Sequence, residues 1–194
     1  MMDRNIISMA LDASVETIGS LRRQLDEIER VCDIVVSALK SGNKVVTAGN
    51  GGSAAEALHM SEELVGRFRG NRVSLPGIAL VADCTALTCI GNDFGFDYIF
   101  SRQIEGLGCK GDVLVVFSTS GNAENLSRAV AAAKVHEMTT VALLGRDGGG
   151  LVDMCDYAIV VPGDATERIQ EAHQVLLHIV LEEVEHSFSV IKDK

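Results

Sequence analysis

The sequence predicts a three-layer, doubly wound α/β fold with a five-stranded parallel sheet and long N-terminal helices. Five short apolar segments recur along the chain, and helical patterns separate them, as in a parallel sheet with helices on both faces. The segment 112–117 is apolar without alternation, which is typical of a strand buried on both faces. Turns rich in glycine or hydroxyl groups follow two of these segments, at the edge where such folds bind ligands.

The order of strands and helices predicts one domain. The predicted strands are residues 44–48, 76–81, 112–117, 139–144 and 156–161. Helices are expected from the first glycine turn to residue 67, over 83–91 and 98–107, over 122–136, and over 166–190. Because no internal repeat, low-complexity segment or linker interrupts this order, we expect a single domain over residues 1–194.

The segment 5–40 precedes the first strand and carries apolar residues at spacings of three and four. This spacing predicts one long amphipathic helix, or two helices with a break. Its forward part is not expected to wrap the core. Two interpretations stay open, an element that packs against a second copy of the chain and an ordinary core helix. We therefore divide the domain into an N-terminal helical oligomerisation segment, 1–40, and an α/β core, 41–194.

Composition narrows the class of protein. The 194 residues are 47% hydrophobic and carry a net charge of −10, which argues against a nucleic-acid partner but allows small phosphates. No signal peptide and no apolar run of the roughly 18 residues of a membrane span is evident, so we expect a cytoplasmic location and no membrane partner. Five cysteines without Cys-x-x-Cys spacing are interpreted as buried free thiols.

The stretch 47–63 is the strongest candidate for a site. A strand ends in Gly49, a turn of Asn50, Gly51, Gly52 and Ser53 follows, and a helix begins at once. Backbone N–H groups at such a helix start suit a phosphate. His59 and Glu63, at i and i+4, share one face of this helix, although Glu62 at i+3 competes for it. Two alternatives stay open, a glycine turn that only packs the helix and a solvated His–Glu pair.

Three further segments carry polar groups in suggestive places. Ser118, Thr119 and Ser120 follow the third strand and predict a second anion cradle, whereas helix capping would need only one hydroxyl. The predicted loop 90–95 offers Asn92 and Asp93 to sugar hydroxyls, with an Asx turn as the alternative. Gln170 and His178 lie eight residues apart, within one broad stripe of the last helix, although a lone histidine such as His178 is more often a core residue. Two imidazoles, a carboxylate and an amide would together suit Zn²⁺.

Six segments together resemble a known family. They are residues 49–68, 91–96, 100–103, 118–122, 145–149 and 168–173. They resemble the sedoheptulose 7-phosphate isomerases, also called phosphoheptose isomerases, of the sugar isomerase (SIS) domain superfamily, whose fold is flavodoxin-like. The likeness runs in order over almost the whole chain, which makes it more specific than a single glycine-rich loop.

The resemblance implies a homotetramer with active sites at subunit interfaces and one zinc per subunit. It implies that Asn50, Gly51, Gly52 and Ser53 line the substrate pocket, that Asn92 and Asp93 contact the sugar, and that Ser118, Thr119 and Ser120 hold the phosphate. His59, Glu63, Gln170 and His178 match the family's zinc site. Glu63 and His178 also match the family's acid/base pair. Glu63 and Gln170 further match residues that contact the substrate. The resemblance thus favours Glu63 over Glu62.

The implied reaction converts sedoheptulose 7-phosphate to D-glycero-D-manno-heptose 7-phosphate, the entry step of nucleotide-activated heptose synthesis for lipopolysaccharide or other surface glycans. One departure concerns the phosphate site, where Ala123 replaces a serine usual in the family. Two alternatives stay open, an isomerase of another ketose phosphate and a non-catalytic, protein-binding SIS relative. That relative lacks the acid/base Glu and His, and this chain has Glu63 and His178 at those positions.

Overall fold

The structure is a computed structural model that describes residues 4–188. In chain order the elements are α1 (Arg4–Ser20), η1 (Leu21–Arg23), α2 (Leu25–Lys40), β1 (Val45–Gly49), α3 (Gly52–Val65), β2 (Gly77–Ala79), α4 (Cys84–Asp93), η2 (Phe96–Tyr98), α5 (Ser101–Leu107), β3 (Val113–Ser118), α6 (Glu124–Val135), β4 (Thr139–Gly145), α7 (Leu151–Met154), β5 (Tyr157–Val161) and α8 (Thr166–Phe188). The closing helix was predicted to reach residue 190, and residues 189 and 190 lie outside the described part of the chain.

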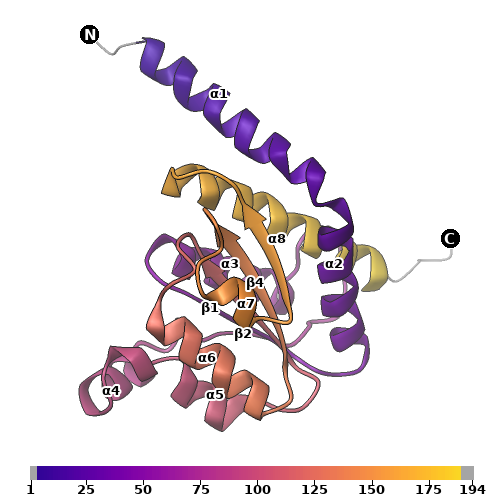
Figure 1. Cartoon of the computed structure of the whole chain (residues 1–194). Helices are drawn as coiled ribbons and strands as arrows, with labels where there is room; N and C mark the ends of the chain where they lie inside the picture. The colour runs from indigo at the N-terminus through magenta and orange to yellow at the C-terminus, as the bar shows by residue number, and fades with distance from the viewer. Residues whose placement is uncertain (1–3, 189–194) are drawn as a thin grey trace, which may run out of the picture.

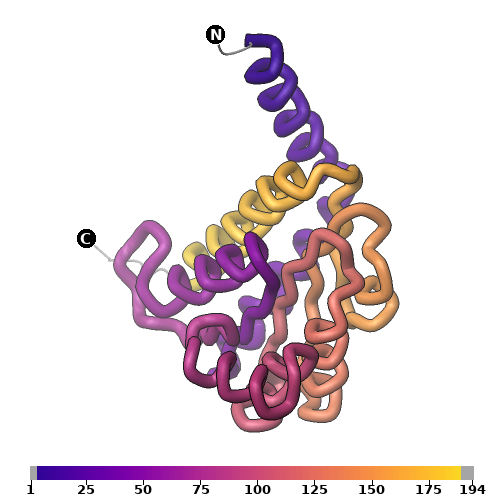
Figure 2. Tube along the Cα trace, turned by 90° about the vertical axis from the view of Figure 1, so that its left-hand side faces the viewer, coloured from indigo at the N-terminus to yellow at the C-terminus, as the bar shows by residue number. Residues whose placement is uncertain are grey.

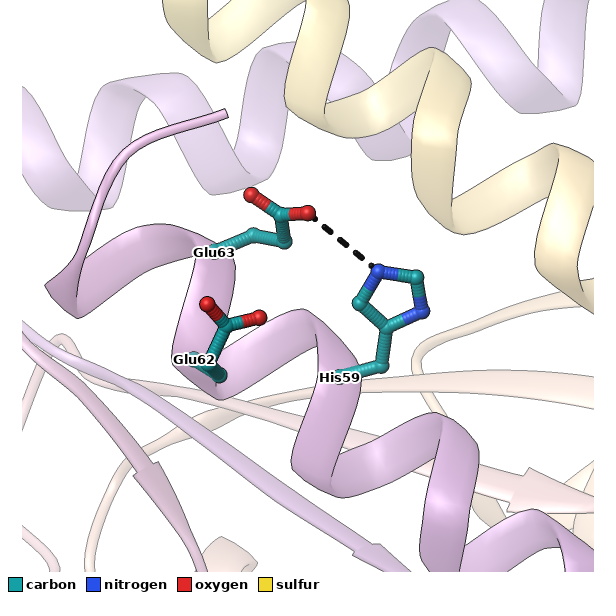
Figure 3. A group of neighbouring side chains, drawn as sticks. All are labelled: His59, Glu62 and Glu63. Atoms are coloured by element: carbon teal, nitrogen blue, oxygen red, sulfur yellow. Dashed lines mark hydrogen bonds and ion pairs between the residues drawn. The ribbon is translucent and has the colours of Figure 1, made fainter. Parts of the chain in front are cut away.

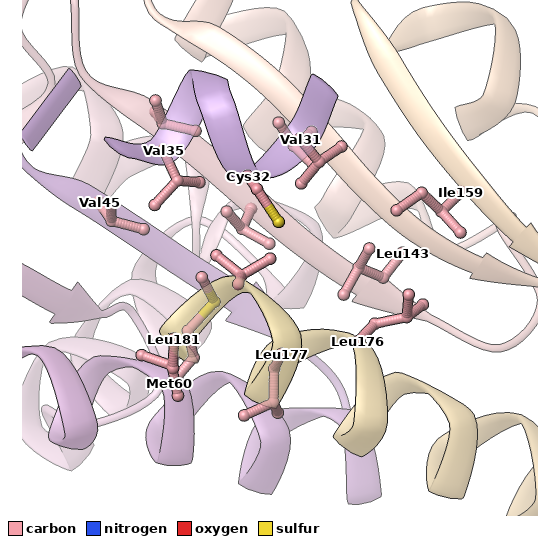
Figure 4. Close-up of a cluster of buried hydrophobic side chains, with 14 of the residues drawn as sticks. Val31, Cys32, Val35, Val45, Met60, Leu143, Ile159, Leu176, Leu177 and Leu181 are labelled. Atoms are coloured by element: carbon pink, nitrogen blue, oxygen red, sulfur yellow. The ribbon is translucent and has the colours of Figure 1, made fainter. Parts of the chain in front are cut away.

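The five strands form one sheet in the order β2-β1-β3-β4-β5, and all neighbouring strands are parallel. Helices cover both faces of this sheet (Figure 1). Alternate side chains of β3 supply both layers of the core, and every residue of the strand is buried. Val113, Val115 and Phe117 pack in the layer of α2, α3 and α8, whereas Leu114 and Val116 pack with α5, α6 and α7. Figure 4 shows part of the first layer, with Val31 of α2, Met60 of α3 and Leu177 of α8. The predicted doubly wound fold is confirmed.

The place where the sheet changes winding direction lies between β1 and β3. These strands are neighbours, and Gly49 at the end of β1 pairs with Phe117 in β3. The helix after β1, α3, packs in one layer of the core, whereas the helix after β3, α6, packs in the other. Loops that leave adjacent strands for opposite faces open a crevice at the carboxyl edge of the sheet. The two predicted anion cradles, 49–53 and 118–122, therefore lie side by side.

The N-terminal segment is two helices, and they have different roles. None of the residues of α1 is buried, and this helix points away from the body of the molecule in both views (Figures 1 and 2). Arg168 at the start of α8 anchors it by donating to the Ala10 carbonyl at 2.9 Å and to the Ser14 hydroxyl. In contrast, α2 buries an apolar stripe in the core. The core-helix interpretation is therefore right for α2, and the oligomerisation interpretation stays a prediction for α1.

Gln24, between η1 and α2, closes one edge of the sheet. Its side-chain amide donates to the Val160 carbonyl at 2.9 Å and accepts from the Val160 N–H at 3.2 Å. Val160 lies on β5, the strand at that edge of the sheet. The amide thus offers the edge strand the same donor and acceptor that a further strand would offer.

Within residues 4–188, no helix has the length and apolarity that crossing a membrane requires. The prediction of buried cysteines is wrong for Cys84, Cys89 and Cys109, which are exposed. Two of these lie on α4, a helix that buries none of its residues, so its apolar spacing did not indicate a core position. Cys32 is buried, and its burial, together with the charges of Glu183 and Asp33, raises its thiol pKa to about 11.

Candidate active site

The glycines before α3 are required by close packing. Gly51 caps the helix with a φ of 58°, a conformation that favours glycine. A Cβ on Gly49 would overlap the Ser53 carbonyl, and a Cβ on Gly52 would overlap the side-chain amide of Gln170. The second contact brings the start of α8 against the start of α3. Two residues predicted to bind substrate, Gly52 and Gln170, thus lie together although they are far apart in the sequence.

The hydroxyls after β3 do not cap the next helix. The N-cap of α6 is Ala123, which makes no side-chain capping bond, so the capping alternative does not apply. Instead, Ser118 Oγ accepts from the N–H of Gly121 at 3.0 Å and holds the turn in shape. Ser120 Oγ accepts from the N–H of Asn122 at 3.4 Å. This turn lies beside the glycine turn of β1, as expected of a second anion cradle.

A pair of amides bridges these loops. Asn50 donates to Asn125 Oδ1 at 2.9 Å, and Asn125 donates to Asn50 Oδ1 at the same distance. Asn125 is buried in the first turn of α6. No sequence pattern indicates this partner, because Asn125 lies in an otherwise ordinary alanine-rich helix. The reciprocal bonds fix the position of Asn50 at the mouth of the crevice.

The group of side chains that can move protons begins on α3 (Figure 3). His59 Nε2 lies 3.3 Å from Glu63 Oε1, so the predicted i,i+4 pair forms. Glu62 also lies close, and the ligand atoms of His59, Glu62 and Glu63 are all within 4.8 Å of one another. Glu62 is exposed, whereas His59 and Glu63 are partly buried. The direct contact with His59 therefore belongs to Glu63.

His178 of α8 joins this group from the other side. Its ring centroid lies 5.1 Å from that of His59 with the planes at 80°, and its other neighbour, Phe68, stacks on it at 5.8 Å. Burial, followed by the nearby His59, lowers the pKa of His178, and the charges of Glu63 and Glu182 partly oppose this. A neutral imidazole at neutral pH can accept a proton. Glu63 and His178 thus flank His59 from two different helices.

Four of the predicted site residues line two hollows, Gly52, His59 and Gln170 the one and Ser120 the other, whereas Glu63 and His178 line neither. One, of about 420 Å³, lies between α3 and α8 and is lined by Gly52, Ala55, Glu56, His59, Glu167, Gln170, Glu171 and Gln174. The other, of about 460 Å³, lies at the ends of β4 and β5 beside the second cradle and is lined by Ser120, Asn122, Arg146, Asp147, Gly163 and Asp164. The first hollow includes one histidine, His59, and the side-chain amides of Gln170 and Gln174, and the second includes one hydroxyl of the cradle, that of Ser120.

Gln174 is a site residue that the sequence analysis missed. Its Nε2 lies 2.9 Å from His59 Nδ1, opposite the ring nitrogen that faces Glu63. Its spacing could have indicated it, because Gln174 is four residues after Gln170 and four before His178 and so shares their helix stripe.

A second His–Glu pair lies behind the first. His173 of α8 is fully buried, its Nε2 lies 3.1 Å from the Leu144 carbonyl, and its Nδ1 lies 3.7 Å from Glu56 Oε2. Glu56 is buried as well and lines the hollow that His59 lines. The alternative of a core histidine, considered for His178, therefore describes His173 instead.

The prediction of a loop at Asn92 and Asp93 is wrong. Helix α4 continues to Asp93 because the N–H of Phe94 still donates to the Ile90 carbonyl at 2.8 Å, and the turn comes only at Gly95, whose φ is 94°. Both side chains are exposed, and Asn92 donates to Asp93 Oδ1 at 2.7 Å. Neither of them lines the two hollows described above.

The residues around His59 could hold a divalent cation. An imidazole and two carboxylates present ligand atoms within 4.8 Å of one another, and a second imidazole, that of His178, flanks the first. Gln170 lines the same hollow as His59. Nitrogen and oxygen donors of this kind suit a borderline ion such as Zn²⁺.

Comparisons with known proteins identify the family of the chain. The sequence profile of the SIS domain family matches residues 11–145. Phosphoheptose isomerase of Nitratiruptor is 54% identical over 80% of this chain and 83% of its own length, and that of Campylobacter concisus is 44% identical over 96% and 99%. The structure of phosphoheptose isomerase from Neisseria gonorrhoeae superposes with a TM-score of 0.90 at 36% identity, covering 95% of this chain and all of that one. A phosphoheptose isomerase structure from Francisella tularensis gives a TM-score of 0.92 at 34% identity, with 96% and 100% covered. The chain therefore belongs to the phosphoheptose isomerases of the SIS domain family.

Proposed function

We propose that this chain converts sedoheptulose 7-phosphate to D-glycero-D-manno-heptose 7-phosphate as an aldose–ketose isomerase. The observation that carries the proposal is the convergence of Glu63 and His178 on His59, beside the glycine-rich start of α3. The relatives at 42–54% identity named phosphoheptose isomerase support the same activity. The reaction needs a base for a carbon-bound proton and a group that serves two oxygens, and these side chains are of the right kinds.

The proton transfers assign a role to each side chain. Glu63 removes a proton from C1 of the ketose while His178 gives a proton to O2, which produces an enediol. Return of a proton to C2 and removal of one from O1 then yield the aldose, so no atom is gained or lost. Positioned acid–base groups of this kind contribute about 10²–10⁴-fold each to the rate. The lowered pKa of His178 keeps its imidazole neutral at neutral pH, with one N–H that can donate and one lone pair that can accept.

The phosphate at the far end of the substrate gives orientation. Ser118, Thr119 and Ser120 are proposed to hold it by hydroxyl and backbone donors, and Asn50, Gly51, Gly52 and Ser53 to line the pocket beside it, at the positive end of α3. Binding energy from this remote group holds the reacting carbons at the acid–base pair. Ala123 lies partly buried at the start of α6 and supplies no hydroxyl, so the three remaining hydroxyls must be sufficient.

Zinc is proposed as the resident metal, one ion per subunit. The residues that would hold it are His59, Glu63, Gln170 and His178, and the donor set around His59 fits this ion. When bound, such an ion can polarise a carbonyl and stabilise negative charge on oxygen. Glu63 is thus proposed both as ligand and as base, and Gln170 both as ligand and as substrate contact.

A homotetramer with interfacial sites is proposed from the exposed surface of α1. This helix exposes Ile6, Met9, Leu11 and Val15 by more than 60% each. A largely apolar hollow of about 540 Å³ between α1, α2 and α8 continues this surface. Packing against copies of the chain would cover both. In such an assembly the exposed Asn92 and Asp93 would contact the sugar in the site of a neighbouring subunit.

We place the reaction in the cytoplasm, at the start of nucleotide-activated heptose synthesis for lipopolysaccharide or another surface glycan. Support for this step comes from the family to which the chain belongs.

A coupled turnover assay tests the proposal. The protein is given five-, six- and seven-carbon ketose phosphates, with and without a chelator and added zinc. We expect turnover with sedoheptulose 7-phosphate that the chelator lowers and zinc restores. Turnover of a shorter ketose phosphate alone would contradict the substrate, and binding of all three without turnover would contradict the enzyme assignment.

Light scattering of wild type and of a Leu11→Lys, Val15→Glu variant tests the tetramer, because these charges on α1 should reduce the mass in solution.

A further inference from the structure

The imidazole of His59 has a side chain on each of its two nitrogens. Nδ1 faces Gln174 at 2.9 Å, and Nε2 faces Glu63 at 3.3 Å. A neutral imidazole carries one N–H and one lone pair, and the partners of the ring decide which nitrogen has the proton. The Glu63 carboxylate can accept a proton from Nε2. If a cation were bound at Nε2 instead, that nitrogen would need its lone pair and the ring proton would reside on Nδ1. Gln174, the partner of Nδ1, must therefore be able to serve both forms of the ring.

The amide of Gln174 can support either form. Its NH₂ group faces Nδ1, so Nδ1 accepts and the proton of His59 resides on Nε2, directed at Glu63. Its oxygen, Oε1, is buried and has no hydrogen-bond partner among residues 4–188. Rotation of the amide by half a turn would place this oxygen on Nδ1. Nδ1 would then carry the proton, and the Nε2 lone pair would be free.

We propose that Gln174 is a positioning residue that sets the tautomer of His59 and permits a change between the two forms. In the metal-free protein the proton resides on Nε2 and bonds to Glu63. With a cation on Nε2, the amide is rotated and accepts the Nδ1 proton. Histidines that bind metals almost always donate the other ring N–H to such an acceptor, and loss of the acceptor costs about 10–100-fold in metal affinity. The second half of this inference rests on the zinc site proposed above, whereas the first half does not.

The first test measures the tautomer without any metal. Side-chain ¹⁵N spectra are recorded in chelator at about pH 8, above the pKa of free histidine. The His59 signals are identified by their loss in His59→Gln. We expect the Nε2–H form in wild type and in Gln174→Met, where Glu63 alone accepts from the ring, and a proton on Nδ1 in Gln174→Glu, whose carboxylate can only accept.

A matched control is Gln103→Met, which removes a partly buried amide that donates to the Leu80 and Ile99 carbonyls, away from His59. It should leave the His59 spectrum unchanged. The wild-type spectrum tests the proposal even if a variant fails to fold, because a metal-free wild type in the Nδ1–H form would overturn the change of tautomer. Identical His59 tautomers in wild type and both Gln174 variants would overturn the role of Gln174.

The second test measures zinc affinity by competition with a coloured chelator. We expect Gln174→Met to bind zinc about 10–100-fold more weakly than wild type. Gln174→Glu should bind at least as tightly, since it retains the acceptor. Added zinc should also convert wild-type His59 to the Nδ1–H form. Equal zinc affinity of Gln174→Met and wild type would overturn the inference. A wild type that binds no zinc would overturn the proposed metal. In that case the metal-free spectra alone would decide the role of Gln174.

Discussion

Two His–Glu pairs lie where α3 meets α8, and they differ in exposure and in the partners of the imidazole. His59 and Glu63 are partly exposed, and both ring nitrogens of His59 face side chains. His173 and Glu56 are buried, and the Nε2 of His173 donates to the Leu144 carbonyl. A carbonyl can only accept, so it fixes a proton on Nε2 and leaves Nδ1 to face Glu56 Oε2 at 3.7 Å. The inner pair, His173 and Glu56, is held by the backbone and is a structural element. The outer pair, His59 and Glu63, has side-chain partners that can rotate, so it is free to take part in chemistry.

The largest difference should appear when a carboxylate of the outer pair is removed. Glu63→Gln keeps the shape of the side chain and cannot accept the substrate proton. We expect kcat to fall by about 10²–10⁴-fold, with substrate binding retained by calorimetry and the melting temperature nearly unchanged. Glu62→Gln is the matched control, since Glu62 is exposed and makes no direct bond to His59. Retained activity in Glu63→Gln would refute the base, and an equal loss in both variants would show that the assignment between neighbours is wrong.

The inner pair should respond in stability instead. Glu56→Leu leaves His173 buried without its partner, and breaking a buried pair in this way costs about 3–5 kcal/mol of unfolding free energy. Urea denaturation measures this loss. The double variant Glu56→Leu, His173→Leu removes both polar groups and should recover part of it, because the two residues are in contact. If the losses of unfolding free energy measured for Glu56→Leu and for His173→Leu simply add in the double variant, the pair does not interact.

A pH effect should distinguish the outer site from the inner pair. The pKa of His178 is lowered in the folded protein, so between that pKa and about 6.5 the unfolded chain binds more protons than the folded one. The unfolding free energy of the metal-free protein should therefore fall as the pH falls through this window. In His178→Gln this part of the pH dependence should be absent. A stability curve with the same slope in both proteins would show that His178 does not titrate as described.

The smallest expected effect concerns the surface around His178. Glu182 forms an exposed ion pair with Arg69, and its charge opposes the lowering of the His178 pKa. Glu182→Gln should cost less than about 1 kcal/mol of stability and lower the His178 pKa further, which proton NMR of the imidazole would record. Glu105→Gln breaks the exposed pair with Arg102 and should leave that pKa alone. A raised pKa in Glu182→Gln would reverse the proposed sign.

The sequence predicts the strands well, because continuous apolar segments such as 112–117 are typical of strands buried on both faces. It leaves the break at Gln24 open because apolar spacing continues through Leu21, Leu25 and Ile28. At the site, the i,i+4 rule predicts the His59–Glu63 contact, which is local. The contact of Glu56 with His173 and the hydrogen bonds of Asn50 with Asn125 join distant segments, so no local pattern indicates them.

The bonds from Gln24 to Val160 have a consequence for solubility. An open sheet presents two unpaired edges, and such edges invite strands from other molecules to add to them. At one edge the amide of Gln24 occupies backbone groups that an incoming strand would use. At the other, β2 is only three residues long, too short to guide a stable addition. Both edges of the sheet are thus poor templates for a strand from another molecule.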